Sequence, residues 1–209
     1  MRLVFVHGWA LGPEMWDWLG PLLGDHAQIR VDLGYFGALR QPDFLPGDIL
    51  VGHSAGLLWG LKTRADWAGA VAINGFSRFA QDARGRGCVK PAALRAMQKS
   101  LTLDADACVA RFRASIDAPP AQAPAQAAPL AEGLALLRDF DAAPALGNRP
   151  FLVVAARDDA LVPPDEAENL AQAAGGQLAL SASGGHGLPW TEAEFCAGRI
   201  EDFLRAHEF

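Results

Sequence analysis

The sequence contains few cysteines, no long hydrophobic segment and no excess of basic residues. Only three cysteines, Cys88, Cys108 and Cys196, occur among the 209 residues. Their odd number and wide spacing argue against a disulfide framework and against a cysteine-based zinc site, so we expect three free thiols in a reducing compartment. The longest apolar runs are far too short to span a membrane. The formal net charge of −6 also argues against binding of nucleic acid or anionic membranes.

The remaining composition is that of an ordinary globular enzyme, with 51% hydrophobic and 20% charged residues. No secretory signal precedes the first apolar run at residues 2–6, which predicts a cytoplasmic protein. No group of His, Asp or Glu has the spacing of metal ligands, and no glycine loop of the phosphate-binding kind occurs. We therefore expect neither a metal nor an organic cofactor.

Short apolar segments alternate with longer amphipathic ones along most of the chain. This order is typical of an α/β protein, in which helices cover both faces of a mostly parallel sheet. The predicted strands are residues 3–6, 28–32, 49–52, 69–73, 151–155 and 177–180. The predicted helices are residues 13–23, 54–65, 91–101, 104–115, 164–174 and 191–207. Thr191 and Glu194 fit a capping box at the start of the last helix.

Residues 76–145 interrupt this alternation. They contain no good strand, at least two helical patterns, and an Ala/Pro/Gln-rich stretch at 118–129 whose composition favours extended or mobile chain. Strands resume at Phe151, and the segment from there to the C-terminus is too short to fold alone. We therefore interpret 1–209 as a single domain, into which residues 76–145 are inserted as a small helical cap.

The segment Gly52-His53-Ser54-Ala55-Gly56 is a G-x-S-x-G motif between a predicted strand and a predicted helix. Strand, sharp turn and helix are the setting of a nucleophile elbow, in which flanking glycines permit a strained turn that presents the serine hydroxyl. The alternative is a turn of small residues with no catalytic role. The predicted strand before it and the predicted helix after it favour the nucleophile elbow. Because a serine alone is a weak nucleophile, it requires a base and a group that orients the base.

In this arrangement the acid and then the histidine follow the serine along the chain. Asp158 and Asp159 lie directly after the strand predicted at 151–155, where catalytic groups of parallel sheets gather. The spacing to Val162-Pro163 favours Asp159, with Asp158 as the alternative and as the residue that stiffens the turn. His186, in a glycine-rich loop after the last strand, is the predicted base.

Acyl transfer also requires hydrogen-bond donors for the developing oxyanion. His7-Gly8-Trp9 follows the first strand, so we assign this role to the backbone N–H groups of Trp9 and Ala55. The Trp9 indole is either a wall of the acyl pocket or ordinary core packing. His7 and His53 lie beside the site and are predicted to be structural.

Three motif regions resemble the pimeloyl-[acyl-carrier-protein] methyl ester esterases of biotin synthesis, which belong to the α/β-hydrolase superfamily. They are residues 6–11 with Trp16, the acid loop 159–163, and 186–189 with 194–196. The resemblance implies the α/β-hydrolase fold and an acyl-enzyme mechanism on Ser54. The chain starts at what would be the third strand of that fold, and residues 32–54 leave no room for a full helix. We therefore expect a trimmed sheet of about six strands.

The first part of the cap is basic, whereas the rest of the chain is acidic. Residues 76–103 carry a balance of +5, which leaves −11 elsewhere. This face is either a solvated helix surface or a docking surface for an acidic partner. The family resemblance implies acyl carrier protein as that partner, and we select Arg84, Arg86 and Arg95 as its contacts.

Other functions share much of this sequence pattern. A thioesterase or a general short-chain carboxylesterase would use the same machinery. A lyase that uses the triad as a base, or a binding protein that keeps only the hydrolase shell, would carry the same motifs. A dehalogenase or an epoxide hydrolase is disfavoured, because these enzymes need an aspartate where this chain has Ser54.

Overall fold

The computed structural model describes residues 1–209 and contains one six-stranded sheet in the order β2-β1-β3-β4-β5-β6. Every neighbouring pair of strands is parallel. The strands are β1 (Arg2–Val6), β2 (Ala27–Val31), β3 (Asp48–His53), β4 (Gly69–Ile73), β5 (Phe151–Ala156) and β6 (Gln177–Ser181). The prediction of six strands is confirmed, and each strand end lies within one residue of its predicted position.

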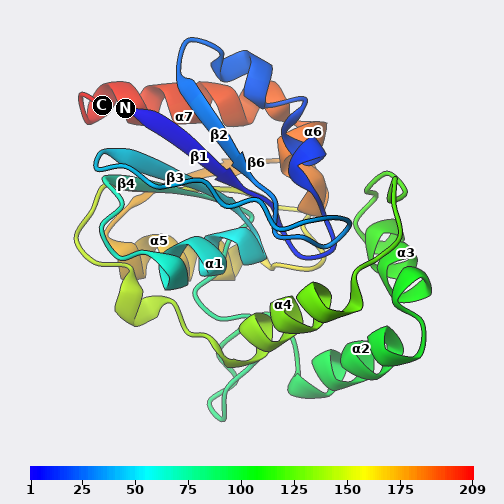
Figure 1. Ribbon diagram of the computed structural model, residues 1–209. Coiled ribbons are helices and arrows are strands. Elements are labelled where there is room, and N and C mark those ends of the chain that lie inside the picture. The colour runs from blue at the N-terminus through cyan, green and yellow to red at the C-terminus, as the bar shows by residue number, and fades with distance from the viewer.

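The sheet is covered on both faces, and each face has its own apolar core. Alternate side chains of a strand point to opposite faces, so Leu50 belongs to one core while Ile49 and Val51 belong to the other. Helices α1 (Ala55–Thr63) and α5 (Pro164–Ala174) cover the first face, as Figure 1 shows. Helix α7 (Ala193–Ala206) covers the second face together with two 3-10 helices, η1 (Pro13–Trp16) and η2 (Gly20–Leu23).

The predicted cap segment lies between β4 and β5 and contains no strand of the sheet. It holds α2 (Pro91–Leu103), α3 (Ala105–Ser115), α4 (Ala127–Asp139) and η3 (Ala143–Ala145). The three α-helices lie together at one end of the sheet in Figure 1. The Asp104 side chain begins α3 by accepting a hydrogen bond from the Ala107 N–H at 2.9 Å.

Helix α4 lies outside the predicted helices and begins inside the stretch that we expected to be extended. Leu130, Leu134 and Leu137 recur at helical spacing and are buried in the core that α1 also joins. Pro129 is the third residue of the helix, where its missing N–H costs nothing. Tertiary burial of the leucines therefore outweighs the poor helical composition of this segment.

The single helix predicted at 13–23 is also wrong, because η1 and η2 are separate short turns. Pro21 has no N–H with which to continue a helix begun at Pro13. The Gln28 side chain instead donates to the carbonyls of Gly20 and Leu23, at 2.8 and 2.7 Å. These bonds satisfy carbonyl groups that a longer helix would have paired internally.

The last predicted helix, residues 191–207, corresponds to α7, and two short unpredicted helices precede it, η4 (Gly185–Gly187) and α6 (Leu188–Thr191). The predicted capping box does not form, since the residue before α7 is Glu192 and no side chain caps this helix. The Thr191 hydroxyl donates instead to the carbonyl of Gly184 at 2.8 Å. Thr191 thus supports the loop that carries His186. None of the helices is both long and apolar enough to cross a membrane, and the three cysteines form no disulfide.

Candidate active site

Ser54 occupies a strained turn between β3 and α1. Its φ and ψ are 52° and −123°, a conformation that is costly for a residue with a side chain and that persists only where the surroundings impose it. The flanking glycines make the turn possible. A Cβ on Gly56 would lie 2.1 Å from the Val6 carbonyl oxygen, and one on Gly52 would lie 2.6 Å from the Leu57 nitrogen. The serine is 6% exposed, and its hydroxyl forms no hydrogen bond within the protein.

His186 and Asp159 form a buried pair at the carboxyl ends of β6 and β5. The His186 Nδ1–H donates to Asp159 Oδ2 at 2.8 Å, and each residue is 5% exposed. The other oxygen of Asp159 accepts the N–H groups of Leu161 and Val162 at 2.8 and 2.9 Å. Because these bonds fix the carboxylate in the acid loop, it holds the imidazole with Nε2 available for proton transfer.

Asp158 faces a different set of partners. Its two oxygens accept the N–H groups of Gly184 and Gly185, at 3.3 and 2.8 Å. The structure therefore brings Asp159 to His186, while Asp158 connects the acid loop to the loop before the histidine.

Two further buried side chains hold the histidine loop. The His53 Nε2–H donates to the His186 carbonyl at 2.9 Å, and burial lowers the pKa of His53 well below its usual 6.5, so His53 is neutral. Asn74 donates from Nδ2 to the Gly185 carbonyl at 2.8 Å and accepts the Ala156 N–H at 3.1 Å. The sequence pattern did not predict a role for Asn74, because Asn74-Gly75 looks like a simple turn. Its position directly after a buried strand was the available signal.

The predicted oxyanion donors belong to two segments that meet at the serine, since Ala55 follows Ser54 directly and Trp9 lines the same cavity as Ser54. Ala55 is the first residue of α1, where a helix has no carbonyl one turn back for the N–H to bind. The Trp9 N–H follows β1 and donates no hydrogen bond within the protein. His7 supports this loop as a neutral ring, because its Nε2 accepts the Leu33 N–H while Nδ1 donates to the Gly8 carbonyl, each at 3.0 Å.

A cavity of about 120 Å³ adjoins Ser54 and is lined almost wholly by apolar side chains. Trp9 lines it, so its indole is both buried and part of the wall. The cap contributes most of the remaining lining, including Leu94 and Met97 from α2 and Phe112 from α3. A second, more polar hollow of about 330 Å³ is lined by His186, Asp158 and Asp117. Leu161 separates the two spaces and lines both.

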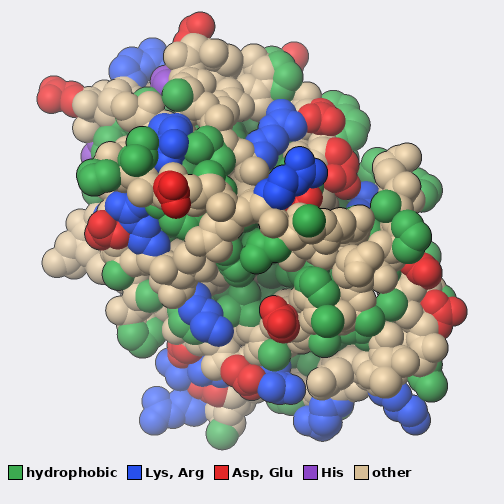
Figure 2. Space-filling model, viewed as in Figure 1, with side chains coloured by type: hydrophobic (Ala, Val, Ile, Leu, Met, Phe, Trp, Pro, Cys, Tyr) green, Lys and Arg blue, Asp and Glu red, His purple; other side chains and the backbone are tan.

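The predicted basic contacts lie on the outside of the cap. Arg84, Arg86 and Arg95 are exposed, and Figure 2 shows Lys and Arg side chains along the edge of the molecule where α2 lies. Arg86 forms an ion pair with Asp82 at 2.6 Å, so part of this charge is neutralised locally. Arg84 and Arg95 form no ion pair. The chain has no cluster of three His, Cys, Asp or Glu side chains suited to a metal ion.

No protein-family model matches the chain, and no curated protein matches it in sequence. Solved structures do resemble it. A bromoperoxidase from Bacillus anthracis is 19% identical with a TM-score of 0.85, over 98% of this chain and 91% of the other. An esterase from Exiguobacterium antarcticum is 18% identical with a TM-score of 0.83, over 98% and 92% of the two chains. An enol-lactonase from Burkholderia xenovorans is 16% identical with a TM-score of 0.79, over 98% and 91%.

These likenesses show the fold, and with the parallel sheet they confirm the predicted α/β-hydrolase fold. The narrower resemblance to pimeloyl-[acyl-carrier-protein] methyl ester esterases is not tested by them and stays a prediction.

Proposed function

We propose that this protein hydrolyses carboxylic esters through an acyl intermediate on Ser54. The observation that carries the proposal is the arrangement at the carboxyl ends of β3, β5 and β6. There a strained serine turn after β3 adjoins an apolar cavity, and a buried Asp159–His186 pair follows β5 and β6 on the same side of β3. The fold of known esterases and a lactonase supports it, although fold alone does not establish an activity.

In the proposed reaction, His186 Nε2 takes the proton of the Ser54 hydroxyl as its oxygen attacks the ester carbonyl. The negative charge that develops on the carbonyl oxygen is met by the N–H groups of Trp9 and Ala55. His186 then protonates the departing alcohol and activates a water molecule that releases the acid. Asp159, whose Oδ2 accepts a hydrogen bond from His186 Nδ1–H at 2.8 Å, stabilises the charged imidazole.

The cavity indicates a short, uncharged acyl group. Its volume of about 120 Å³ is below the roughly 300–1,000 Å³ of pockets that take drug-sized ligands. No charged side chain lines it. A general short-chain carboxylesterase or thioesterase is therefore the substrate class that the cavity favours.

A second, distinct candidate substrate is pimeloyl-[acyl-carrier-protein] methyl ester, with a role in biotin synthesis. It rests on the sequence resemblance and is supported by the placement of basic side chains on α2. One face of this helix lines the cavity through Leu94 and Met97, whereas Arg95 is exposed on another. A carrier protein that met Arg84, Arg86 and Arg95 would lie against the same helix that borders the site.

The first experiment is hydrolysis of p-nitrophenyl esters of increasing acyl length by wild type and by Ser54→Ala. We expect the butyrate to be preferred and Ser54→Ala to lower kcat by about 10⁴- to 10⁶-fold, as loss of a serine nucleophile does elsewhere. A fluorophosphonate probe should label wild type but not Ser54→Ala. An unlabelled, inactive wild type would contradict the proposal and favour a binding protein. Labelling without turnover of any ester would point to a triad-based lyase.

The carrier proposal has its own experiment. Reversal of Arg84, Arg86 and Arg95 to Glu should raise KM for the carrier-linked methyl ester and leave KM for a p-nitrophenyl ester unchanged, since only the former meets this surface. Equal effects on both substrates would contradict docking on the cap.

A further inference from the structure

The oxyanion loop (residues 7–11) is joined to the cap by two hydrogen bonds. The Trp9 indole N–H donates to the Leu130 carbonyl in α4 at 2.8 Å, and the Ala10 carbonyl accepts Arg113 Nη1 from α3 at 3.0 Å. The hydrogen bonds within the loop all go to the Gly8 carbonyl, which accepts the Leu11 N–H at 3.3 Å and the His7 Nδ1–H at 3.0 Å. The main chain after Trp9 therefore depends on the cap for its orientation.

Ala10 has an unusual backbone conformation. Its φ is 55°, in the left-handed region that residues with a side chain seldom adopt. Ala10 is fully buried, and Arg113 is the sole donor to its carbonyl. A buried carbonyl without a hydrogen-bond partner costs free energy. Without the bond from Arg113, the loop is therefore expected to change conformation until the Ala10 carbonyl finds another donor or water. Such a change would move the Trp9–Ala10 peptide that lies between this carbonyl and Trp9, and so displace Trp9, whose main-chain N–H is the predicted oxyanion donor.

The Arg113 side chain connects α3 to the oxyanion loop and to the segment that follows α3. The side chain is nearly buried, with the residue 4% exposed. Besides Ala10, it donates from Nε to the Pro119 carbonyl at 2.6 Å, and Glu14 lies 3.7 Å from Nη2. The guanidinium carbon lies 5.5 Å from the centre of the Phe36 ring. A planar group with several donors in fixed directions can make these contacts together, whereas a single ammonium cannot.

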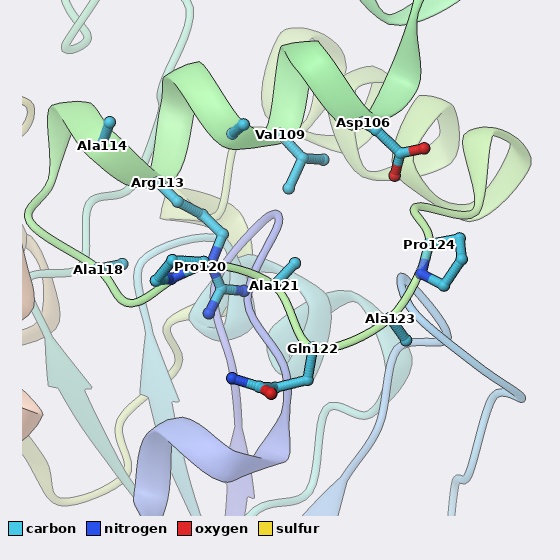
Figure 3. A pocket seen from close by; sticks show the side chains of 11 residues that line it. Asp106, Val109, Arg113, Ala114, Ala118, Pro120, Ala121, Gln122, Ala123 and Pro124 are labelled. Carbon is cyan, nitrogen blue, oxygen red and sulfur yellow. The ribbon is translucent and has the colours of Figure 1, made fainter.

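No other basic side chain is available to replace Arg113. Figure 3 shows it extending from α3 towards the stretch that carries Pro120, Ala121 and Gln122, across a hollow of about 540 Å³. It also lines a hollow of about 220 Å³ beside Glu14. Arg113 is the one basic residue in either lining, and it does not line the cavity that adjoins Ser54.

We propose that Arg113 is a positioning residue for ester hydrolysis, which holds the Trp9 N–H towards the developing oxyanion through the carbonyl of Ala10. The inference rests on the proposed esterase function. Arg113 touches neither the substrate cavity nor the reacting atoms, so its contribution belongs to the transition state and not to the binding of the ester.

The experiment compares Arg113→Met, which keeps much of the side-chain length, with Arg111→Met on the same helix. Arg111 is exposed and bonds only to the Ser100 hydroxyl, which makes it a matched control for loss of one arginine from α3. We expect Arg113→Met to lower kcat about 10- to 100-fold, part of the 10²- to 10³-fold that loss of one oxyanion donor costs. KM should change less than about twofold, because the cavity lining is intact.

Inhibitor binding separates positioning from general damage. A trifluoromethyl ketone forms a tetrahedral adduct with the serine, whereas the methyl ketone of the same chain binds without one. In Arg113→Met the Ki of the trifluoromethyl ketone should rise by the factor by which kcat/KM falls, while that of the methyl ketone stays constant. Should Arg113→Met not fold, Arg113→Lys keeps the charge but not the planar fork, and the same pattern is expected of it.

An unchanged kcat in the folded variant, or equal weakening of both ketones, would overturn the role of Arg113. That result differs from failure of the proposed function, in which wild type itself neither hydrolyses esters nor reacts with the fluorophosphonate. Wild-type behaviour of Arg111→Met, together with a selective loss in Arg113→Met, supports the inference.

Discussion

The acid loop (residues 159–163) and the oxyanion loop lie at the same rim of the sheet but are held in different ways. In the acid loop, Asp159 is fixed by the N–H groups of residues two and three positions further on. In the oxyanion loop, Trp9 and Ala10 bond to Leu130 and Arg113, which are 121 and 103 residues away. The carboxylate that orients the base is thus held by its own loop, whereas the Trp9 indole and the main chain that follows the predicted oxyanion donor are held by the docked cap.

The sharpest test of the acid loop compares its two adjacent aspartates. Asp159→Asn should lower kcat by about 10⁴-fold, because an amide in this place favours the wrong imidazole tautomer. Asp158→Asn removes only bonds to the histidine loop, so we expect a loss of about tenfold or less. Steady-state kinetics with p-nitrophenyl butyrate would decide between them. A larger loss in Asp158→Asn would reverse our assignment of the acid.

The dependence of the oxyanion loop on the cap can be tested from the cap side. Gly133 of α4 contacts this loop so closely that a Cβ would lie 2.6 Å from Trp9 Cδ1 and 2.5 Å from the Tyr35 hydroxyl oxygen. Gly133→Ala should therefore lower kcat about tenfold and cost about 1–3 kcal/mol of stability through overpacking. Kinetics and urea unfolding measure the two effects.

Gly198 is the matched control for that substitution, since it lies in α7 with no atom within 4 Å of an added Cβ. Gly198→Ala should leave activity unchanged and raise stability by about 0.5–1 kcal/mol, as alanine does in a helix. The comparison of the two loops would be wrong if Gly133→Ala were stable and fully active.

Substitution of Asp48, at the end of β3 opposite Ser54, should change the free energy of unfolding but not the activity. Burial raises the pKa of Asp48, but hydrogen bonds from Arg2 and from the Leu45 N–H outweigh it and hold the pKa below the usual 3.8. A carboxylate with a lowered pKa in the folded state stabilises the fold above its unfolded-state pKa, and this stabilisation is lost as pH falls through the folded-state value.

Asp48→Asn should consequently cost about 1.5–3 kcal/mol at pH 7, the contribution of hydrogen bonds to a charged group. The deficit should be smaller at about pH 3, below the ordinary aspartate pKa of about 3.9, because the unfolded chain there binds the proton that the folded carboxylate resists. Urea unfolding at both pH values measures the difference, and kcat should stay at the wild-type value. A deficit independent of pH would show that the charge of Asp48 is not what stabilises this end of the sheet.

The sequence was informative where the structure is set by neighbouring residues. The four inner strands were predictable because each is a short apolar run that is buried on both faces. The edge strands β2 and β6 are only partly buried and were recognised from their place in the alternation of strands and helices. The choice of Asp159 over Asp158 was possible because spacing within a loop fixes which carboxylate points towards the histidine. The serine turn was recognisable for the same reason, since its glycines and its strained residue are adjacent.

The rest depended on partners that are distant along the chain. Helix α4 contains Pro129 and Gly133, poor residues for a helix, and is stabilised by burial that becomes apparent only in three dimensions. Arg113 resembles any other arginine of the cap, because its acceptors at Ala10 and Pro119 are main-chain carbonyls with no sequence signature. Asn74 binds main-chain groups from two loops in the same way.

The strand order also has a consequence for the newborn chain. Ser54 follows β3 in the middle of the sheet, but His186 follows β6, an edge strand that can join only after β5 is in place. A nascent chain that has not yet been synthesised as far as residue 186 therefore contains the serine turn but lacks its proposed base, His186. Under the proposed function, such a chain cannot yet attack esters, and recovery of activity after dilution from denaturant requires that β6 has docked.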